Sequence, residues 1–296
     1  MKLLLVVNPV SGNKPKGELL NYARKRCQLY GIELAVFRTT GQNDLAKLKE
    51  NIAVEKPDRL GSVGGDGTFM LAVKATRNSP LPIGFLPMGS ANGMAKELNV
   101  SPPETALDDL IASQMIVGMD LLKVNDEHLC MHIGDVGLNA QMVAWYDEDG
   151  SRGMATYAKY LLRALRQSEV FEYQFEVDGN KYSGRAVMIG FGNGTKFGTG
   201  IPMNTVGNPF DGKFEITIIK EINAEMLIRA GLSIIDKTFV KESESIVVSA
   251  TEATIQLNTE QMLQLDGEVI GKTSEVKISI EPSAVPVIST AANPYL

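Results

Sequence analysis

Short runs of hydrophobic residues alternate with longer amphipathic segments over residues 1–122 of the chain. The hydrophobic runs predict buried strands at Leu3–Val7, Ile32–Phe37, Arg59–Val63 and Ile83–Leu86. The amphipathic segments predict helices at Glu18–Tyr30, Asp44–Glu55, Thr68–Arg77, Ala91–Leu98 and Glu104–Ser113. Strands that alternate with helices form a parallel sheet with helices on both faces. Residues 1–122 are therefore predicted to form an α/β domain that binds ligands beyond the carboxyl ends of its strands.

The pattern changes after Leu122, where strand-like runs follow one another directly. These runs lie at His128–Ile133, Phe171–Val177, Tyr182–Phe191, Phe214–Ile219, Ser245–Ser249, Thr254–Leu257, Met262–Leu265 and Glu275–Ile280. Two helices are expected between them, at Met154–Gln167 and Ala224–Thr238, and Asp178-Gly179-Asn180 is typical of a hairpin turn. We therefore predict an antiparallel, sandwich-like second domain over residues 123–280. The tail of residues 281–296 contains prolines and is too short to form a structure by itself.

The composition is that of an ordinary folded protein, and its 296 residues suffice for one large domain or two medium-sized ones. The two cysteines, Cys27 and Cys130, have neither metal-binding spacing nor a disulfide framework, so a cytoplasmic location is expected. The first hydrophobic run is too short for a signal sequence or a membrane span. A net charge of −6 argues against nucleic acid as a main partner.

The third predicted strand leads into a stretch with three glycines around one carboxylate, Gly64-Gly65-Asp66-Gly67-Thr68. Glycines let backbone N–H groups approach a phosphate closely, and a helix that starts here, with Thr68 as its N-cap, adds positive potential. Asp66 would be repelled by phosphate unless it holds a metal ion or takes a proton. Taken alone, these residues fit an ordinary strand-to-helix turn equally well.

Two further loops at predicted strand ends combine glycine with a hydroxyl residue. Asn8–Asn13 follows the first strand and Pro87–Gly93 follows the fourth. A plain turn explains each loop when it is considered alone. Because the carboxyl ends of parallel strands share one edge of a sheet, however, the three loops are expected to converge on one crevice.

Two other glycine-rich stretches match nucleotide motifs only in part. Gly207–Lys213 fits the start of a Walker A pattern, but Phe214 stands where a Ser or Thr should bind magnesium. Gly190–Gly194 has the spacing of a dinucleotide fingerprint, yet it ends a predicted strand and opens no helix. Both stretches are therefore predicted to be ordinary turns.

Asp266 and Glu268 flank Gly267, so their side chains should point to the same face of an extended segment. Close carboxylates raise one another's proton affinity, which suits a general base near neutral pH. We expect Glu268 to abstract the proton, because its side chain is longer, while Asp266 fixes the turn or assists. The opposite assignment stays open, and Asp66 is the third candidate.

In order and spacing, five motifs resemble those of diacylglycerol-kinase-type catalytic domains, in the superfamily that also holds sphingosine kinases and NAD kinases. The matching segments are Asn8–Gly12 (NPxSG), Gly64–Thr68 (GGDGT), Pro87–Asn92 (PxGTAN, with Ser90 for Thr), Gly198–Gly200 with Pro202 and Asp211-Gly212 (a glycine-rich loop and a Pro…DG metal turn), and Gln264–Glu268 (QxDGE). Met119-Asp120-Leu121 stands where the family has its strand into the second domain. The resemblance covers nearly the whole chain.

The resemblance implies a Rossmann-like three-layer α/β nucleotide-binding domain with NAD-kinase/diacylglycerol-kinase-like topology, followed by an antiparallel β-sandwich domain. It implies ATP in the interdomain cleft, Mg²⁺, a lipid hydroxyl as acceptor, and a tail of residues 281–296 that returns to the first domain. The implied nucleotide contacts are Asn8, Pro9, Ser11, Gly12, Thr39, Gly64, Gly65, Asp66, Gly67, Thr68, Gly89, Ser90 and Asn92. The implied magnesium site uses the Asp211 carboxylate and the backbone carbonyls of Asn208 and Lys213. The implied catalytic residues are Glu268, Asp266 and Asp66.

Two departures from the family pattern bear on the activity. Met70-Leu71-Ala72 replaces the usual Asn-Glu-Val after the GGDGT motif, and Gly93 replaces the Asp that usually follows the PxGTAN loop. They motivate the alternative of a non-catalytic nucleotide-binding member. An NAD kinase is the less favoured alternative, because that family's TPTGSTAY-like segment is absent. The sequence does not identify the lipid.

A lipid kinase must reach its substrate at a membrane surface, and an acidic protein needs a local basic patch for this contact. One candidate patch consists of Lys14, Lys16, Arg24, Lys25 and Arg26. Another is the predicted helix Met154–Gln167, whose basic residues are Lys159, Arg163 and Arg166, although a core-facing role is favoured for that helix. Peripheral contact with the inner membrane surface is therefore an expectation. The oligomeric state is open, and a homodimer is compatible with the sequence.

Overall fold

The computed structural model describes residues 1–149, 159–160, 163, 169–196, 203–204, 206–220 and 245–296. They form two compact units, which we call unit 1 (Met1–Asp120 with Pro282–Leu296) and unit 2 (Leu121–Glu281). The chain leaves unit 1 within strand β5 (Ile116–Val124) and returns within β14 (Glu268–Ile288). No helix among the described residues is both long and apolar enough to cross a membrane.

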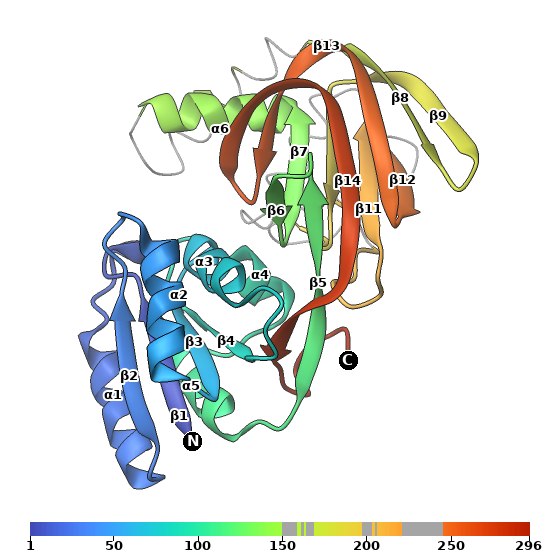
Figure 1. Ribbon diagram of the computed structural model, residues 1–296. Coiled ribbons are helices and arrows are strands. Elements are labelled where there is room, and N and C mark those ends of the chain that lie inside the picture. Colours follow the sequence, from blue (N-terminus) through green and yellow to red (C-terminus); the bar gives the residue numbers. More distant parts are fainter. Residues whose placement is uncertain (150–158, 161–162, 164–168, 197–202, 205, 221–244) are drawn as a thin grey trace. The chain divides into compact units, whose positions relative to one another are not determined.

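Unit 1 contains a parallel sheet in which the strand order is β4, β3, β1 and β2 (Figure 1). The strands are β1 (Lys2–Val7), β2 (Glu33–Arg38), β3 (Arg59–Gly64) and β4 (Ile83–Pro87). The end of β14 adds a further parallel strand, because Val287 pairs with Ile83 of β4. The predicted parallel sheet is confirmed, but the tail is not an appendage, since its first residues extend a strand.

Helices cover both faces of this sheet (Figure 1). They are α1 (Gly17–Leu29), α2 (Asp44–Glu55), α3 (Asp66–Thr76), α4 (Gly93–Glu97) and α5 (Pro103–Ala112), with a short 3₁₀ turn at Ser11–Asn13. Leu3 and Leu5 of β1 pack with α1 and α5 on one face. On the other face Phe69 of α3 stacks on Phe85 of β4 with ring centroids 4.4 Å apart, and α2 packs beside α3.

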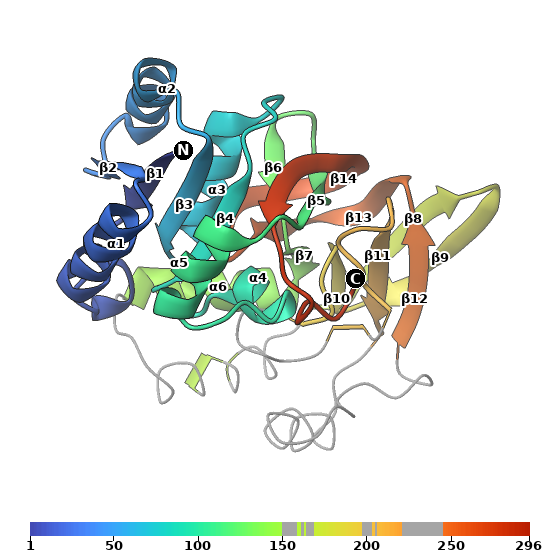
Figure 2. The same ribbon diagram turned by 90° about the horizontal axis from the view of Figure 1, so that it is seen from below.

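Unit 2 is built from antiparallel strands in the order β12, β11, β10, β7, β13 and β14. Its described elements are β6 (His128–Cys130), β7 (Ile133–Gly137), α6 (Leu138–Asp149), β8 (Phe171–Val177), β9 (Asn180–Ala186), β10 (Met188–Gly192), β11 (Phe214–Ile219), β12 (Ser245–Ala250) and β13 (Glu252–Leu265). The β8–β9 hairpin, yellow in Figure 2, pairs with β13 and turns at Asp178-Gly179 as predicted.

The two long strands β13 and β14 fold this unit into a sandwich. The first part of β13 pairs with β8 and its last residues pair with β7, so one strand serves both layers. Register shifts between Gln256 and Gln261 and between Leu263 and Gln264 allow the bend. The rings of Phe171, Phe191 and Phe214 are buried in the core between the layers. The predicted antiparallel β-sandwich is confirmed.

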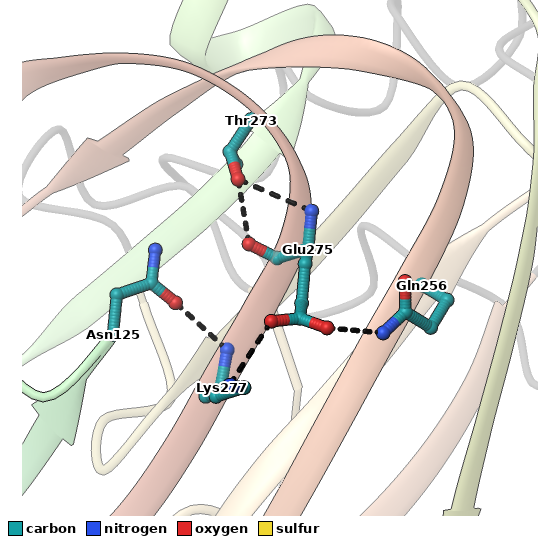
Figure 3. A network of polar contacts seen from close by, with 5 residues as sticks. All are labelled: Asn125, Gln256, Thr273, Glu275 and Lys277. Atoms are coloured by element: carbon teal, nitrogen blue, oxygen red, sulfur yellow. Dashed lines mark hydrogen bonds and ion pairs between the residues drawn. The ribbon is translucent and has the colours of Figure 1, made fainter.

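A polar network fixes the register of β13 and β14 on the outside of the sandwich (Figure 3). Gln256 lies directly opposite Glu275 and donates to its carboxylate, while Lys277 forms an ion pair with Glu275 at 3.2 Å. The Thr273 hydroxyl accepts the Glu275 N–H at 3.1 Å, and the Asn125 side chain accepts the Lys277 N–H at 2.8 Å. Cross-strand pairs of this kind stabilise one register of a sheet over its neighbours.

Three details differ from the predicted elements of unit 2. Thr254–Leu257 and Met262–Leu265 belong to one strand, because a bulge rather than a turn separates them. The run Tyr182–Phe191 is divided between β9 and β10. Helix α6 was not expected, since it follows β7 without a loop, where Gly137 (φ 98°) turns the chain. The predicted helix Ala224–Thr238, most of Met154–Gln167 and the segment Gly198–Gly200 with Pro202 lie outside the described residues.

Candidate functional site

The three strand-end loops of unit 1 lie side by side at one edge of the parallel sheet. We call Asn8–Asn13 the first loop, Gly64–Thr68 the second loop and Pro87–Asn92 the third loop. The Asn8 N–H donates to the Val63 carbonyl at 3.1 Å, and the Met88 N–H donates to the Gly64 carbonyl at 2.7 Å. The Thr39 N–H donates to the carbonyl of Val7 at 3.0 Å, so Thr39 lies beside the start of the first loop.

Glycines allow the backbones of the loops to touch. A Cβ on Gly89 would stand 2.3 Å from the Gly65 Cα, which no side chain could tolerate without moving the second loop. Gly12 has a φ of 63°, and a Cβ there would stand 2.4 Å from the Met88 carbonyl oxygen. These glycines are therefore required by the packing of the loops on one another.

Gly67 differs from its neighbours, because nothing in the described protein requires a glycine there. It is exposed, and a Cβ at this position would meet no atom within 4 Å. It lies in the first turn of α3, where alanine is a better helix former than glycine. The open space therefore lies at a helix N-terminus, whose free N–H groups and dipole favour an anion such as phosphate.

Asp66 positions the third loop through helix α4. Its two carboxylate oxygens accept the N–H groups of Gly93 at 2.9 Å and Met94 at 3.1 Å, and thereby cap the helix. Asn92, with a φ of 53°, closes the loop, since its side chain accepts the Gly89 N–H at 2.8 Å and donates to the Gly89 carbonyl at 3.0 Å. A role of Asp66 toward magnesium stays a prediction.

The assignment of Thr68 as an N-cap is wrong. Helix α3 begins two residues earlier, at Asp66, and Gly65 occupies the N-cap position. Thr68 is buried, and its hydroxyl lies 2.2 Å from the point where a Cβ of Gly64 would stand. The hydroxyl residue therefore fills the space left by Gly64. Of the other predicted contacts, Pro9 and Ser90 are exposed, and the Ser11 hydroxyl donates to the Asn8 carbonyl at 3.2 Å.

Lys16 joins the first and third loops, a role that the sequence did not reveal. Its side chain is buried, and its ammonium donates to the carbonyls of Lys14 at 2.8 Å, Met88 at 3.3 Å and Ser11. Burial lowers the pKa of Lys16, and the charge of Lys14 adds to this effect. The predicted place of Lys16 in a basic surface patch is wrong, because the structure buries its ammonium among backbone carbonyls that replace its water shell.

In unit 2 Asp266 and Gly267 form the turn between β13 and β14, so the prediction that Asp266 and Glu268 share one face of an extended segment is wrong. The Asp266 carboxylate accepts three successive N–H groups, those of Met131 at 2.9 Å, His132 at 2.9 Å and Ile133 at 3.2 Å. Burial raises the pKa of Asp266, although these hydrogen bonds oppose the rise. Glu268, in contrast, is exposed at the start of β14. Asp266 therefore fixes the turn, and Glu268 is accessible to a substrate.

The predicted magnesium residues form a turn that leads into β11. The Asp211 carboxylate accepts the Lys213 N–H at 2.9 Å, and the Asn208 side chain accepts the Phe210 N–H at 3.0 Å. Their oxygen donors fit Mg²⁺, which prefers carboxylate and carbonyl ligands. No cluster of three or more His, Cys, Asp or Glu side chains suited to a metal ion occurs among the described residues. A metal ion in this turn would therefore depend on backbone carbonyls.

Glu215, two residues beyond this turn, is a buried carboxyl group. Its Oε1 accepts the Ser249 hydroxyl at 3.0 Å. Burial raises its pKa to about 7, and the charge of Asp211 contributes to the rise. The prediction that both partial nucleotide motifs are ordinary turns is confirmed for Gly207–Lys213, which forms a turn before β11. It is wrong for Gly190–Gly192, which is part of strand β10.

Two family models together match most of the chain. The model described as diacylglycerol kinase catalytic domain matches residues 2–124. The model described as YegS C-terminal NAD kinase beta sandwich-like domain matches residues 135–289. The first match contains the three strand-end loops, and the second contains the Asp211 turn and the hairpin with Glu268.

Curated relatives carry the name "Putative lipid kinase". A protein of Staphylococcus aureus (strain Newman) is 26% identical over 299 residues, which are 94% of this chain and 92% of the relative. One from Staphylococcus carnosus (strain TM300) is 28% identical over 218 residues, which are 71% of this chain and 70% of the relative. These proteins extend the similarity over both units.

Solved structures support the fold. A crystal structure of a putative diacylglycerol kinase from Bacillus anthracis str. Sterne has a TM-score of 0.77 at 24% identity and covers 99% of this chain and 98% of its own. Another diacylglycerol kinase structure from that strain has a TM-score of 0.74 at 20% identity, with the same coverage. The α/β domain followed by a β-sandwich is thus shared with these proteins.

Replacing Gly67 with alanine tests the second loop as a phosphate site. The variant should be as stable as the parent or slightly more so, because its Cβ meets no protein atom within 4 Å. Its affinity for ATP, measured by titration calorimetry, should fall at least tenfold, a loss of about 1.4 kcal/mol or more. Gly65→Val is a poorer probe, since a Cβ there would stand 3.1 Å from the Gly89 Cα.

Gly17→Ala is the matched control, because Gly17 opens helix α1 and its Cβ would also meet no atom within 4 Å. This control should bind ATP as the parent does. Parent-like affinity in a folded Gly67→Ala protein would show that no phosphate approaches Gly67.

Proposed function

We propose that this chain, which belongs to the family that joins a diacylglycerol kinase catalytic domain to a YegS-type C-terminal domain, is an ATP-dependent lipid kinase. Membership of a kinase family implies a nucleotide substrate. The observation that supports ATP binding best is the convergence of three glycine-containing loops beside the open space at Gly67. The acceptor proposed is the hydroxyl of a diacylglycerol-like or related lipid.

The chain's own groups would act mainly by positioning and charge neutralisation, which supply most of the catalysis in phosphoryl transfer. The N–H groups of the second loop and the start of α3 would hold the ATP phosphates. Lys16 would keep the first and third loops together, and its positive charge would favour an anion nearby. Mg²⁺ bound with ATP would neutralise phosphate charge, and Asp66 is the carboxylate proposed to organise that ion. Asp211, with the backbone carbonyls of Asn208 and Lys213, is proposed to hold a structural Mg²⁺.

Glu268 is the proposed general base. Its exposed carboxylate would take the proton from the lipid hydroxyl as that oxygen attacks the γ-phosphorus, while ADP departs with the bridging oxygen. Asp266 would keep the hairpin in place, since three backbone N–H groups already occupy its carboxylate. The bond that breaks is the one between the γ-phosphorus and that bridging oxygen.

A non-catalytic nucleotide-binding protein is the second candidate. It is favoured by the engagement of Asp66, whose oxygens cap α4, and by Gly93 and Met70 at positions where the family has polar residues. An NAD kinase is not proposed, because the curated relatives are named as lipid kinases.

We propose that the protein is cytoplasmic and reaches the acceptor lipid by peripheral contact with the inner surface of the membrane. Within the first basic patch, Lys16 is buried and Arg26 forms an ion pair with Asp108 at 2.6 Å. The exposed Lys14, Arg24 and Lys25 are the residues proposed to meet anionic lipid. The helix that includes Lys159 and Arg163 falls largely outside the described residues.

A phosphotransfer assay with labelled ATP tests the proposal directly. Vesicles that contain diacylglycerol, ceramide, sphingosine or phosphatidylglycerol would be offered in turn, with and without added anionic lipid. Transfer of label to one of these lipids is the expected result. ATP binding without transfer to any of them would favour the non-catalytic candidate, and the absence of ATP binding would exclude both.

Glu268→Gln and Asp266→Asn should have different phenotypes. Glu268→Gln should lower turnover by roughly 10²-fold or more, with ATP affinity and stability unchanged, because its side chain is exposed. Asp266→Asn should mainly lower the free energy of unfolding, at about 1–3 kcal/mol for each N–H group left without an acceptor. If Asp266→Asn were the more inactive variant at normal stability, the two roles would have to be exchanged.

Asp211→Asn tests the magnesium turn without reference to activity. In the parent, Mg²⁺ should raise the melting temperature, because a ligand that binds the folded state stabilises it. The variant should lose most of this increase, since the one charged group among the three proposed ligands becomes neutral. Excess chelator, as a control, should return the parent to its metal-free value. An equal effect of Mg²⁺ on parent and variant would place the ion elsewhere.

A further inference from the structure

Two buried polar side chains lie next to the hairpin that bears Glu268. Asp135 of β7 is fully buried and Gln264 of β13 is 2% exposed, and the two residues are direct partners in the antiparallel pairing. Val136 and Leu263, their neighbours along the strands, belong to the sandwich core. Because successive side chains in a strand point to opposite faces, Asp135 and Gln264 lie on the face away from that core.

The contacts of Gln264 reach the hairpin itself. Its Oε1 accepts the Gly267 N–H at 2.7 Å, and its Nε2 donates to the carboxylate of Asp135. A carboxylate can only accept hydrogen bonds, so Asp135 requires the amide of Gln264 to point its NH₂ group inward. This orientation leaves the Gln264 oxygen for Gly267. Asp135 therefore determines the orientation of the Gln264 amide, which in turn holds the hairpin.

Asp135 is itself fixed by the first turn of α6. Its carboxylate accepts the Ala140 N–H at 2.8 Å and the Asn139 side-chain N–H at 2.6 Å. Burial raises the pKa of Asp135 to about 6, which means that these hydrogen bonds do not fully offset the cost of burying the carboxylate.

The hairpin turns at two successive residues of positive φ, the pattern of the two-residue type I′ turn, for which Asp-Gly is a preferred sequence. Asp266 and Gly267 both have positive φ, of 51° and 88°. The Asp266 carboxylate holds one side of the turn against the N–H groups of residues 131–133, and Gln264 holds the Gly267 N–H on the other side. Glu268 follows Gly267 directly, so the direction of its backbone is set by both attachments.

We propose that Asp135 and Gln264 are positioning residues, which set the place of the Glu268 carboxylate by orienting the Gly267 N–H. The inference deepens the proposed function and rests on it, because it assigns these residues a role in the reaction of Glu268. Neither side chain touches the substrate in this account. Loss of the pair should misplace the base, and a displacement of about 1 Å can lower a rate by as much as roughly 10²-fold.

Gln264→Met removes both hydrogen bonds at similar side-chain volume. The turnover number should fall at least about tenfold, while the KM for ATP stays within about twofold, since the nucleotide loops are untouched. Hydrogen exchange of the Gly267 amide should accelerate at the same time. Gln261→Met is the matched control, because Gln261 is a buried glutamine of the same strand whose amide donates to Thr259 at 3.0 Å and not to the hairpin.

Exchanging the two groups provides a rescue. Asp135→Asn and Gln264→Glu should each lower turnover and Gly267 protection. In Asp135→Asn the new NH₂ group faces an N–H donor, and in Gln264→Glu two carboxylates face each other. In the double variant the new amide can donate to the new carboxylate, whose second oxygen accepts the Gly267 N–H, provided that Asn139 rotates its amide. Turnover and Gly267 protection should therefore be higher in the double variant than in either single one.

Hydrogen exchange of the Gly267 amide is measured without any phosphotransfer, so it tests the hold on the turn independently of the proposed function. A parent protein that transfers no phosphate to any lipid would refute the function, while accelerated exchange in Gln264→Met would still show that the pair holds the turn. Parent-like exchange in that variant, or parent-like turnover despite accelerated exchange, would overturn the positioning role. If Gln264→Met fails to fold, the double variant decides instead. Turnover and Gly267 protection no higher in the double variant than in the two single variants would overturn the positioning role.

Discussion

The close approach of Gly65 and Gly89, which belong to two loops of unit 1, is the constraint on which the candidate site depends. A Cβ on Gly89 would stand 2.3 Å from the Gly65 Cα, so the second and third loops can adopt this arrangement only with glycine at position 89. The approach brings the start of α3 and the start of α4 together. It also places Asp66, at the N-terminus of one helix, within reach of the first N–H groups of the other.

In unit 2 side-chain hydrogen bonds, rather than close glycine contacts, hold the backbone of the candidate site in place. The hairpin that bears Glu268 bends through positive φ at Asp266 and Gly267, and it is held by a carboxylate on one side and by an amide on the other. Hydrogen bonds to a charged acceptor contribute about 1.5–3 kcal/mol each. Such contacts restrict a turn strongly enough to place a reacting group, while Glu268 itself stays in water.

Much of the fold could be predicted because the pattern of neighbouring hydrophobic and polar residues determines many of its helices and strands. Helix α2 begins at Asp44 and ends at Glu55 as its amphipathic pattern predicts, and the hydrophobic run Phe214–Ile219 is strand β11. The tail and the long strand β13 were less predictable, because bulges and partners distant in sequence decide where a strand continues. Helix α6 was missed, since no turn residues other than a glycine separate it from the preceding strand.

The candidate site divides in the same way. The glycines of the three loops could be found from the sequence, because each stands next to a strand end. Lys16 could not, since its partner Met88 is 72 residues away in the chain. Nor could the pairing of Asp135 with Gln264, which are separated by 129 residues. Asp135 lies two residues beyond the predicted run His128–Ile133, so no local signal pointed to it.

The most direct test of the central claim is amide hydrogen exchange with and without a non-hydrolysable ATP analogue, at constant Mg²⁺. If these loops bind the nucleotide, the analogue should slow exchange in all three strand-end loops together, at residues 8–13, 64–68 and 87–92. The segment Gly190–Gly194, which has only the spacing of a nucleotide motif, should exchange as before. Protection confined to Gly190–Gly194, or no protection in the three loops at saturating analogue, would contradict the claim that these loops bind the nucleotide.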